Sequence, residues 1–161
     1  MVAVGKYLQT LPYVNPKDLT IWGWSYGGFM SSLCLMKGEG VFTSAISVAP
    51  VMHWRFYDSV YTERYMRTPK ENPEGYNANS PLENYEKLQN RRYNYLIVHG
   101  TADDNVHIQN TYALTDKMVA KNIPFQMHIY TDKNHGIYGG KTRLHLYEKF
   151  MEFLENRKYV E

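Results

Sequence analysis

The sequence predicts an α/β fold with a mostly parallel sheet and helices on both of its faces. Short apolar, β-branched runs alternate along the chain with segments whose apolar residues recur at helical spacing. A strand, a helix and a second strand in this order form a right-handed crossover unit, so neighbouring strands are parallel. The 161 residues are 43% hydrophobic and 21% charged, the composition of one globular domain with a real core.

The elements follow one another in the order that this fold requires. Strands are predicted at residues 18–22, 42–49, 93–100 and 124–130, and helices at residues 2–11, 26–36, 107–121 and 141–156. Residues 51–90 interrupt the rhythm, because this segment is long, aromatic and polar and contains Pro69, Pro73 and Pro81. We expect it to form short helices and loops that cap one edge of the sheet.

The overall composition excludes several classes of function. A formal net charge of +2 is too small to predict nucleic-acid binding. No apolar run is long enough to span a bilayer, and the first residues lack the pattern of a signal peptide. Cys34 is the single cysteine, so an internal disulfide is impossible, and its helical position predicts a small buried hydrophobe. No metal site and no cofactor are expected.

The most informative stretch runs from Thr20 to Met30 and contains the pattern Gly-x-Ser-x-Gly around Ser25. This pattern is typical of a nucleophile elbow, a sharp turn between a strand and a helix with a serine at its tip. Gly23 and Gly27 suit the turn, because a side chain at either position would crowd the neighbouring strand or helix. The alternative is a glycine-rich turn with an incidental serine, but the predicted strand and helix on either side favour the elbow.

A nucleophilic serine needs a base and a carboxylate, and both follow in the chain order of the α/β-hydrolases. The third predicted strand is followed by Asp103 and Asp104, and the fourth is followed by a polar loop with His135. The residues alone do not separate the two aspartates; we expect one to face the histidine and the other to cap the next helix. His135 is preferred because the other histidines fall on strands, on helices or in the capping segment: His53, His99, His107, His128 and His145.

Three longer blocks of sequence are more specific than the pattern around Ser25 alone. They are Trp22–Gly28, Ala49–Val51 with Tyr57–Met66, and His99–His107, and Asp132 and His135-Gly136 complete the set. With these blocks, the chain resembles the catalytic domain of the dipeptidyl peptidase IV and fibroblast activation protein branch of the prolyl oligopeptidase family of serine peptidases. The resemblance covers essentially the whole chain. It implies an α/β-hydrolase fold.

The resemblance also implies a role for individual residues. Ser25 would be the nucleophile, Asp103 the carboxylate and His135 the base. The backbone N–H of Tyr26 would donate to the oxyanion, and Asn105 would hold the carbonyl of the substrate's terminal residue. The pocket for the residue before the scissile bond would be lined by Val51, Trp54, Tyr57, Tyr61 and Val106, although ordinary packing of a capping segment is the alternative for the tyrosines.

By the same resemblance, the expected activity is a serine peptidase that releases dipeptides after proline or alanine through an acyl-enzyme on Ser25. Peptides would be the substrates. The alternatives are a catalytically incompetent fragment, a non-catalytic binding relative and a broader esterase or lipase. The retained Ser25, Asp103 and His135 argue against the binding relative, and the tyrosine-rich segment 51–66 argues against a lipase.

The resemblance further implies that residues 1–161 correspond to the C-terminal part of a hydrolase domain. The family's β-propeller, its substrate-anchoring glutamates, the first hydrolase strands and the second oxyanion donor have no counterpart in this sequence. We therefore expect an uncovered sheet edge and poor stability of the chain in isolation. Relatives are type II membrane or extracellular proteins and form homodimers, in which residues 146–159 would contribute to the interface.

Overall fold

The computed structural model describes residues 1–157 and contains a four-stranded, entirely parallel sheet. Its strands lie in the order β1-β2-β3-β4, and their bounds are Thr20–Trp24, Ser44–Val48, Asn94–Gly100 and Gln126–Tyr130. The register pairs Trp24 with Val48 and Val48 with Val98, so the carboxyl ends of these three strands lie side by side. The predicted α/β fold with a parallel sheet is confirmed.

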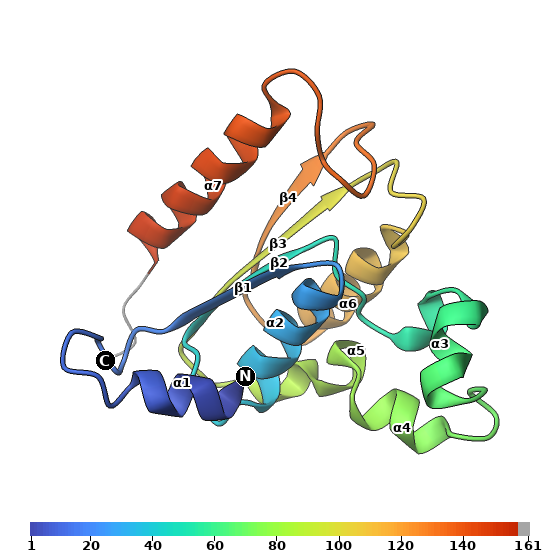
Figure 1. Ribbon diagram of the computed structural model, residues 1–161, viewed down its shortest axis with the longest axis horizontal. Coiled ribbons are helices and arrows are strands. Elements are labelled where there is room, and N and C mark those ends of the chain that lie inside the picture. The colour runs from blue at the N-terminus through green and yellow to red at the C-terminus, as the bar shows by residue number, and fades with distance from the viewer. Residues whose placement is uncertain (158–161) are drawn as a thin grey trace.

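Helices cover both faces of the sheet (Figure 1). Helix α2 (Tyr26–Lys37) connects β1 to β2, and α6 (Gln109–Ala120) connects β3 to β4; both lie on one face. Helix α7 (Thr142–Asn156) lies alone on the other face, and α1 (Val2–Leu8) precedes β1.

The core has two halves because successive residues of a strand point to opposite faces of the sheet. On the α2 and α6 side, Ala45 and Ile97 belong to one cluster of buried residues with Leu35 and Leu114. On the α7 side, the alternate strand residues pack against that helix: Ile46, Val48, Leu96 and Val98 meet Leu146, Phe150 and Phe153. The near-continuous apolar runs in the sequence are therefore strands buried on both faces.

Several predicted boundaries differ from the structure by one to three residues, and three of them illustrate the causes. The first strand begins at Thr20 instead of Asp18, because the Asp18 N–H closes a turn onto the Asn15 carbonyl at 3.1 Å. The first helix ends at Leu8, where the Thr10 N–H bonds to the Tyr7 carbonyl in a tighter turn. The third predicted helix begins at Gln109, two residues later than expected.

Residues 51–90 form short helices and loops, as predicted: η1 (Trp54–Phe56), α3 (Ser59–Met66), α4 (Pro73–Ala78), α5 (Pro81–Asn84) and η2 (Tyr85–Leu88). Side-chain caps start several of them, and the Asp58 carboxylate accepts a hydrogen bond of 2.8 Å from the Tyr61 N–H. The Trp54 ring lies 5.8 Å from the Tyr26 ring, which places this segment beside the predicted nucleophile.

Cys34 is buried in the core, and its burial raises the pKa of the thiol. It is therefore a packing residue, as expected from its place on the helix. Within the described residues, no helix is both long and apolar enough to cross a membrane.

A buried tyrosine predicts a loss of stability at alkaline pH. Tyr95 is 2% exposed, its hydroxyl lies 2.7 Å from the Ser32 hydroxyl, and its burial raises the pKa to about 12 from 10.0. The folded protein therefore holds this proton more tightly than the unfolded chain, so the stabilisation is full below pH 10 and is lost as pH rises toward 12. A difference of this size corresponds to roughly 3 kcal/mol.

We expect the free energy of unfolding, measured in urea at pH 8, 10 and 11, to fall more steeply in the wild type than in Tyr95→Phe. The variant has no phenol to ionise at this position, so the difference between the two curves isolates Tyr95 from Tyr93 and Tyr130, whose pKa values are also raised to about 12. Parallel curves would contradict the assignment.

Candidate active site

Ser25 occupies a strained turn between β1 and α2. Its backbone angles are φ 60° and ψ −117°, a conformation that residues with a side chain seldom adopt. The Ser25 N–H donates to the Val48 carbonyl of the neighbouring strand at 2.8 Å, and this bond helps to hold the turn. The serine side chain does not cap α2. This is the backbone geometry of a nucleophile elbow.

Two glycines permit the chain to pass closely through this turn. A Cβ atom at Gly23 would lie 2.4 Å from the backbone of Gly27, and one at Gly28 would lie 2.8 Å from the Val48 carbonyl oxygen. Neither neighbour can move without shifting the backbone. A Cβ atom at Gly27 would meet nothing within 4 Å, so this glycine is not required for space. Gly23 and Gly28, and not Gly27, are therefore the glycines that a close approach requires.

Asp103 is buried beyond the end of β3 and accepts hydrogen bonds on both carboxylate oxygens. Oδ1 accepts from the N–H groups of Asn105 at 3.0 Å and Val106 at 2.9 Å, and Oδ2 lies 2.8 Å from His135 Nδ1. Burial would raise the pKa of the Asp103 carboxyl, but the hydrogen bonds from His135 and His99 hold it well below its ordinary value. Asp103 is therefore a carboxylate at neutral pH.

The neighbouring Asp104 is exposed and takes a different place from the one expected. The N-terminal cap of α6 is Ile108, which makes no side-chain cap bond, so the prediction that the second aspartate caps this helix is wrong. The turn between β3 and α6 is instead held by Asp103 Oδ1. One carboxylate thus closes its own loop and contacts His135.

The His135 loop is held by two side chains that sequence reasoning missed. Trp24 Nε1 donates to the His135 carbonyl at 2.8 Å, and Arg143 donates to the Gly136 carbonyl through Nε at 3.0 Å and Nη2 at 2.8 Å. The Arg143 guanidinium also lies 5.2 Å from the centre of the Trp24 ring. No local pattern signals these contacts, because Trp24 and His135 lie 111 residues apart and the Arg143 bonds to Gly136 depend on how the intervening loop folds.

The elbow, Asp103 and His135 follow the ends of β1, β3 and β4 at one edge of the sheet. Within residues 1–157, no hydrogen bond joins the Ser25 hydroxyl to His135. Such a bond is often long in an enzyme without substrate and shortens in the complex. The structure brings Asp103 and His135 together directly, while Ser25 is presented on its own turn.

An apolar cavity of about 550 Å³ lies beside the elbow. Its lining residues come from α2, η1, α3 and the end of α4: Tyr26, Phe29, Trp54, Tyr61, Thr62, Tyr65, Met66 and Asn79. The rings of Trp54 and Tyr61 stack at 6.0 Å. Val51 and Val106 were expected in the pocket wall, but they are 1% and 0% exposed and pack behind Trp54. The spacing of Tyr61 and Tyr65, four residues apart on α3, is the signal that could have predicted Tyr65 in this wall.

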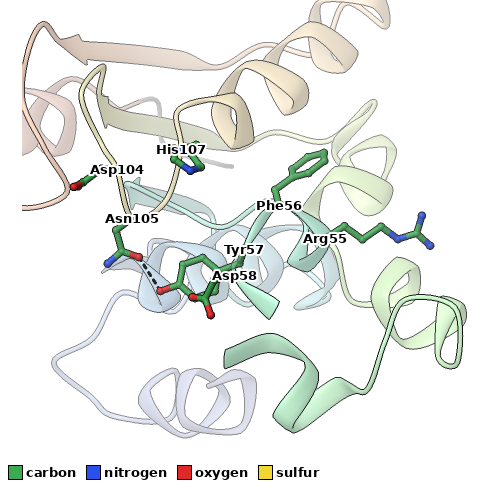
Figure 2. A pocket seen from close by; sticks show the side chains of 7 residues that line it. All are labelled: Arg55, Phe56, Tyr57, Asp58, Asp104, Asn105 and His107. Carbon is green, nitrogen blue, oxygen red and sulfur yellow. Dashed lines mark hydrogen bonds between the residues drawn. The ribbon is translucent and has the colours of Figure 1, made fainter. Parts of the chain in front are cut away.

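A second, more polar cavity of about 770 Å³ opens near Tyr57 and Asn105 (Figure 2). The Tyr57 hydroxyl donates to Asn105 Oδ1 at 2.7 Å, and the Tyr57 ring also lies 5.9 Å from the Trp54 ring. Tyr57 therefore joins the wall of this cavity, through Asn105, to the wall of the apolar cavity, through Trp54. The remaining lining residues are Arg55, Phe56, Asp58, Asp104 and His107.

Comparison with known proteins decides the family. The sequence profile of the prolyl oligopeptidase family matches residues 1–158. The chain belongs to the prolyl oligopeptidase family. It is 45% identical over 157 residues to a probable dipeptidyl-aminopeptidase B of Aspergillus oryzae, a match that covers 96% of this chain and 17% of that protein. It is 40% identical over 156 residues to dipeptidyl peptidase 4 of Felis catus, covering 96% of this chain and 20% of the relative.

Solved structures of this family are also similar to the chain in three dimensions. It superimposes on Porphyromonas gingivalis dipeptidyl peptidase 4 with a TM-score of 0.93 at 53% identity, over 98% of this chain and 22% of that one. A putative dipeptidyl aminopeptidase IV from Bacteroides ovatus follows with a TM-score of 0.91 at 30% identity, again over 98% and 22% of the two chains. The chain thus spans about a fifth of the length of the relatives that it matches.

Proposed function

We propose that this chain carries the catalytic serine, acid and base of a serine peptidase that removes dipeptides after proline or alanine. The observation that carries this proposal is the 2.8 Å hydrogen bond between His135 Nδ1 and the buried Asp103, at the same sheet edge as the Ser25 elbow. A carboxylate on Nδ1 keeps the proton there and leaves Nε2 free to act as a base. Similarity to proteins named dipeptidyl peptidases adds support for the reaction class.

In the proposed reaction, His135 Nε2 takes the proton of the Ser25 hydroxyl as the serine oxygen attacks the substrate carbonyl. The backbone N–H of Tyr26, at the start of α2, donates to the resulting oxyanion. His135 then gives the proton to the leaving amine, and an ester on Ser25 remains. Water, deprotonated by His135, hydrolyses this ester and returns the free serine.

Proline or alanine before the scissile bond fits the apolar cavity beside the elbow. Tyr26, Trp54 and Tyr61 supply flat aromatic walls against which a small, rigid and apolar ring can pack. Asn105, held by Tyr57, is proposed to donate its amide to the carbonyl of the substrate's terminal residue. Val51 and Val106 support the Trp54 wall from behind.

Residues 1–161 are proposed to form the C-terminal part of the hydrolase domain of a longer peptidase, in keeping with the fraction of the relatives that they span.

We further propose a homodimer in which α7 contributes to the interface; of the expected interface residues 146–159, Lys158 and Tyr159 lie outside the described residues. For the whole protein we propose a plasma-membrane or extracellular location, as the family resemblance implies. A non-catalytic binding role is disfavoured by the intact pairing of Asp103 with His135.

The proposal is tested by treating the folded protein with a fluorophosphonate probe and by following cleavage of glycyl-prolyl and glycyl-leucyl p-nitroanilides. We expect a covalent adduct on Ser25, found by peptide mass spectrometry, and cleavage of the prolyl substrate at least about tenfold faster than the leucyl one. A folded sample that forms no adduct at Ser25 would contradict a serine peptidase. An adduct without a preference for proline would keep the nucleophile and overturn the assigned specificity.

A further inference from the structure

His99 lies near the end of β3, four residues before Asp103 and in contact with it. Its side chain is 0% exposed, and every polar atom of the ring has a partner. Nε2 lies 2.8 Å from the Val106 carbonyl oxygen and 3.2 Å from Asp103 Oδ2, and Nδ1 lies 2.7 Å from the Thr111 hydroxyl. Three polar partners hold a buried histidine ring in one orientation.

The partners also determine which nitrogen carries the proton. A carbonyl oxygen and a carboxylate oxygen can only accept, so Nε2 of His99 must be the N–H donor. Thr111 can donate its hydroxyl proton, so Nδ1 of the neutral ring accepts from it. The opposite tautomer would direct the Nε2 lone pair at two oxygens. The Val106 carbonyl and the Asp103 carboxylate therefore select the tautomer with the proton on Nε2, and the Thr111 hydroxyl, which can donate as well as accept, satisfies Nδ1.

We propose that His99 is a positioning residue for the catalytic aspartate: its Nε2–H, oriented by Thr111, fixes Asp103 Oδ2 for its bond with His135. Oδ2 then lies between two imidazole rings, with His135 Nδ1 at 2.8 Å and His99 Nε2, whose hydrogen bond of 2.8 Å goes to the Val106 carbonyl, at 3.2 Å. The other carboxylate oxygen is occupied by the N–H groups of Asn105 and Val106. The carboxylate can therefore neither rotate nor withdraw. This inference rests on the proposed peptidase function of the same site.

The fixed position of Oδ2 has a consequence for His135. A carboxylate that cannot rotate holds the Nδ1–H of His135 in one direction, so the ring keeps the tautomer in which Nε2 is free to accept the Ser25 proton.

The test compares His99→Met, which has no donor, with His99→Gln, whose amide N–H can replace Nε2–H. The readout is the ¹H NMR signal of the His135 Nδ1–H, which reports its hydrogen bond to Asp103, together with the rate of the fluorophosphonate reaction. In His99→Met we expect this signal to be lost to solvent exchange and the reaction to become about tenfold slower, because the Asp103 carboxylate is then free to turn away from His135. His99→Gln should restore both the signal and most of the rate.

Thr111→Val should give a smaller effect in the same direction, because it removes only the hydroxyl that holds the His99 ring through Nδ1. Thr115→Val is the matched control: Thr115 lies one turn later on α6 and its hydroxyl bonds to the Thr111 carbonyl and not to His99. It should leave the His135 Nδ1–H signal and the rate unchanged. Equal loss of stability in both His99 variants without a change in the signal would overturn the proposal in favour of a packing role.

The wild-type protein provides a further test that needs no variant and no activity. Long-range ¹H–¹⁵N spectra should show His99 as the neutral Nε2–H tautomer with Nδ1 accepting a hydrogen bond; the Nδ1–H tautomer would refute the proposal. If the protein fails to react with the fluorophosphonate while His99 shows the Nε2–H tautomer and the His135 Nδ1–H signal responds to His99→Met, the proposed function fails and the positioning role stands.

Discussion

Ser25→Ala is expected to abolish acyl transfer while leaving the fold intact. Without the hydroxyl no ester can form, so the rate of prolyl p-nitroanilide cleavage should fall by at least about 10⁴-fold. The serine hydroxyl does not cap α2, so its removal should cost little stability. The measurements are initial rates, fluorophosphonate labelling and thermal unfolding of the same preparation.

Ser31→Ala is the matched control for this change. Ser31 lies on the same helix and donates only to the Gly27 carbonyl, at 2.8 Å, so its replacement should keep both labelling and peptidase activity within a few-fold of the wild type. If Ser25→Ala retained activity comparable to this control, the nucleophile would have to lie elsewhere in the chain.

Gly23→Ala is expected to have the largest effect on stability among substitutions at the elbow. Its Cβ atom would lie 2.4 Å from the carbonyl carbon and oxygen of Gly27, so β1 and the first turn of α2 must move apart. Forcing atoms into such a packed site costs roughly 3 kcal/mol. The same movement displaces Ser25, so we expect the fluorophosphonate reaction to slow by about 100-fold. Urea unfolding and labelling kinetics measure the two effects.

Gly27→Ala carries the same added methyl group two residues from the nucleophile but into open space. A Cβ atom there meets nothing within 4 Å, and alanine is favoured over glycine in a helix by about 0.5–1 kcal/mol. This variant should therefore be at least as stable as the wild type. Similar destabilisation by both substitutions would show that the elbow is sensitive to any side chain, and the close-approach explanation would fail.

The elements that the sequence predicted correctly are those with a local cause. The periodic apolar residues of α2 and α7 and the β-branched runs of β2 and β3 give the same pattern whatever surrounds them. The elbow could also be predicted, since its strand, its glycines and its helix are contiguous in the chain. Errors were concentrated at element ends such as Asp18, where a turn bond competes with the strand.

Other parts of the site could not be predicted, because they depend on which side chains face each other across loops. The two aspartates are adjacent in the sequence, and only the fold shows that Asp103 contacts His135 while Asp104 is exposed. Val51 and Val106 are apolar, as a pocket wall requires, but the packing places both behind Trp54. Arg143 and Trp24 had no signal, since each donates to a backbone carbonyl of the His135 loop, and Trp24 reaches that loop from 111 residues away.

By itself the sequence determined an α/β fold with a serine at the tip of an elbow and a histidine beyond the last strand, because hydrophobic period, glycine spacing and chain order are local properties. The tertiary structure alone decided the hydrogen-bond network around the carboxylate. Asp103 takes two backbone N–H groups on one oxygen and two imidazoles on the other. That arrangement requires β3, α6 and the β4 loop to meet at one point, and only the packed sheet brings them there.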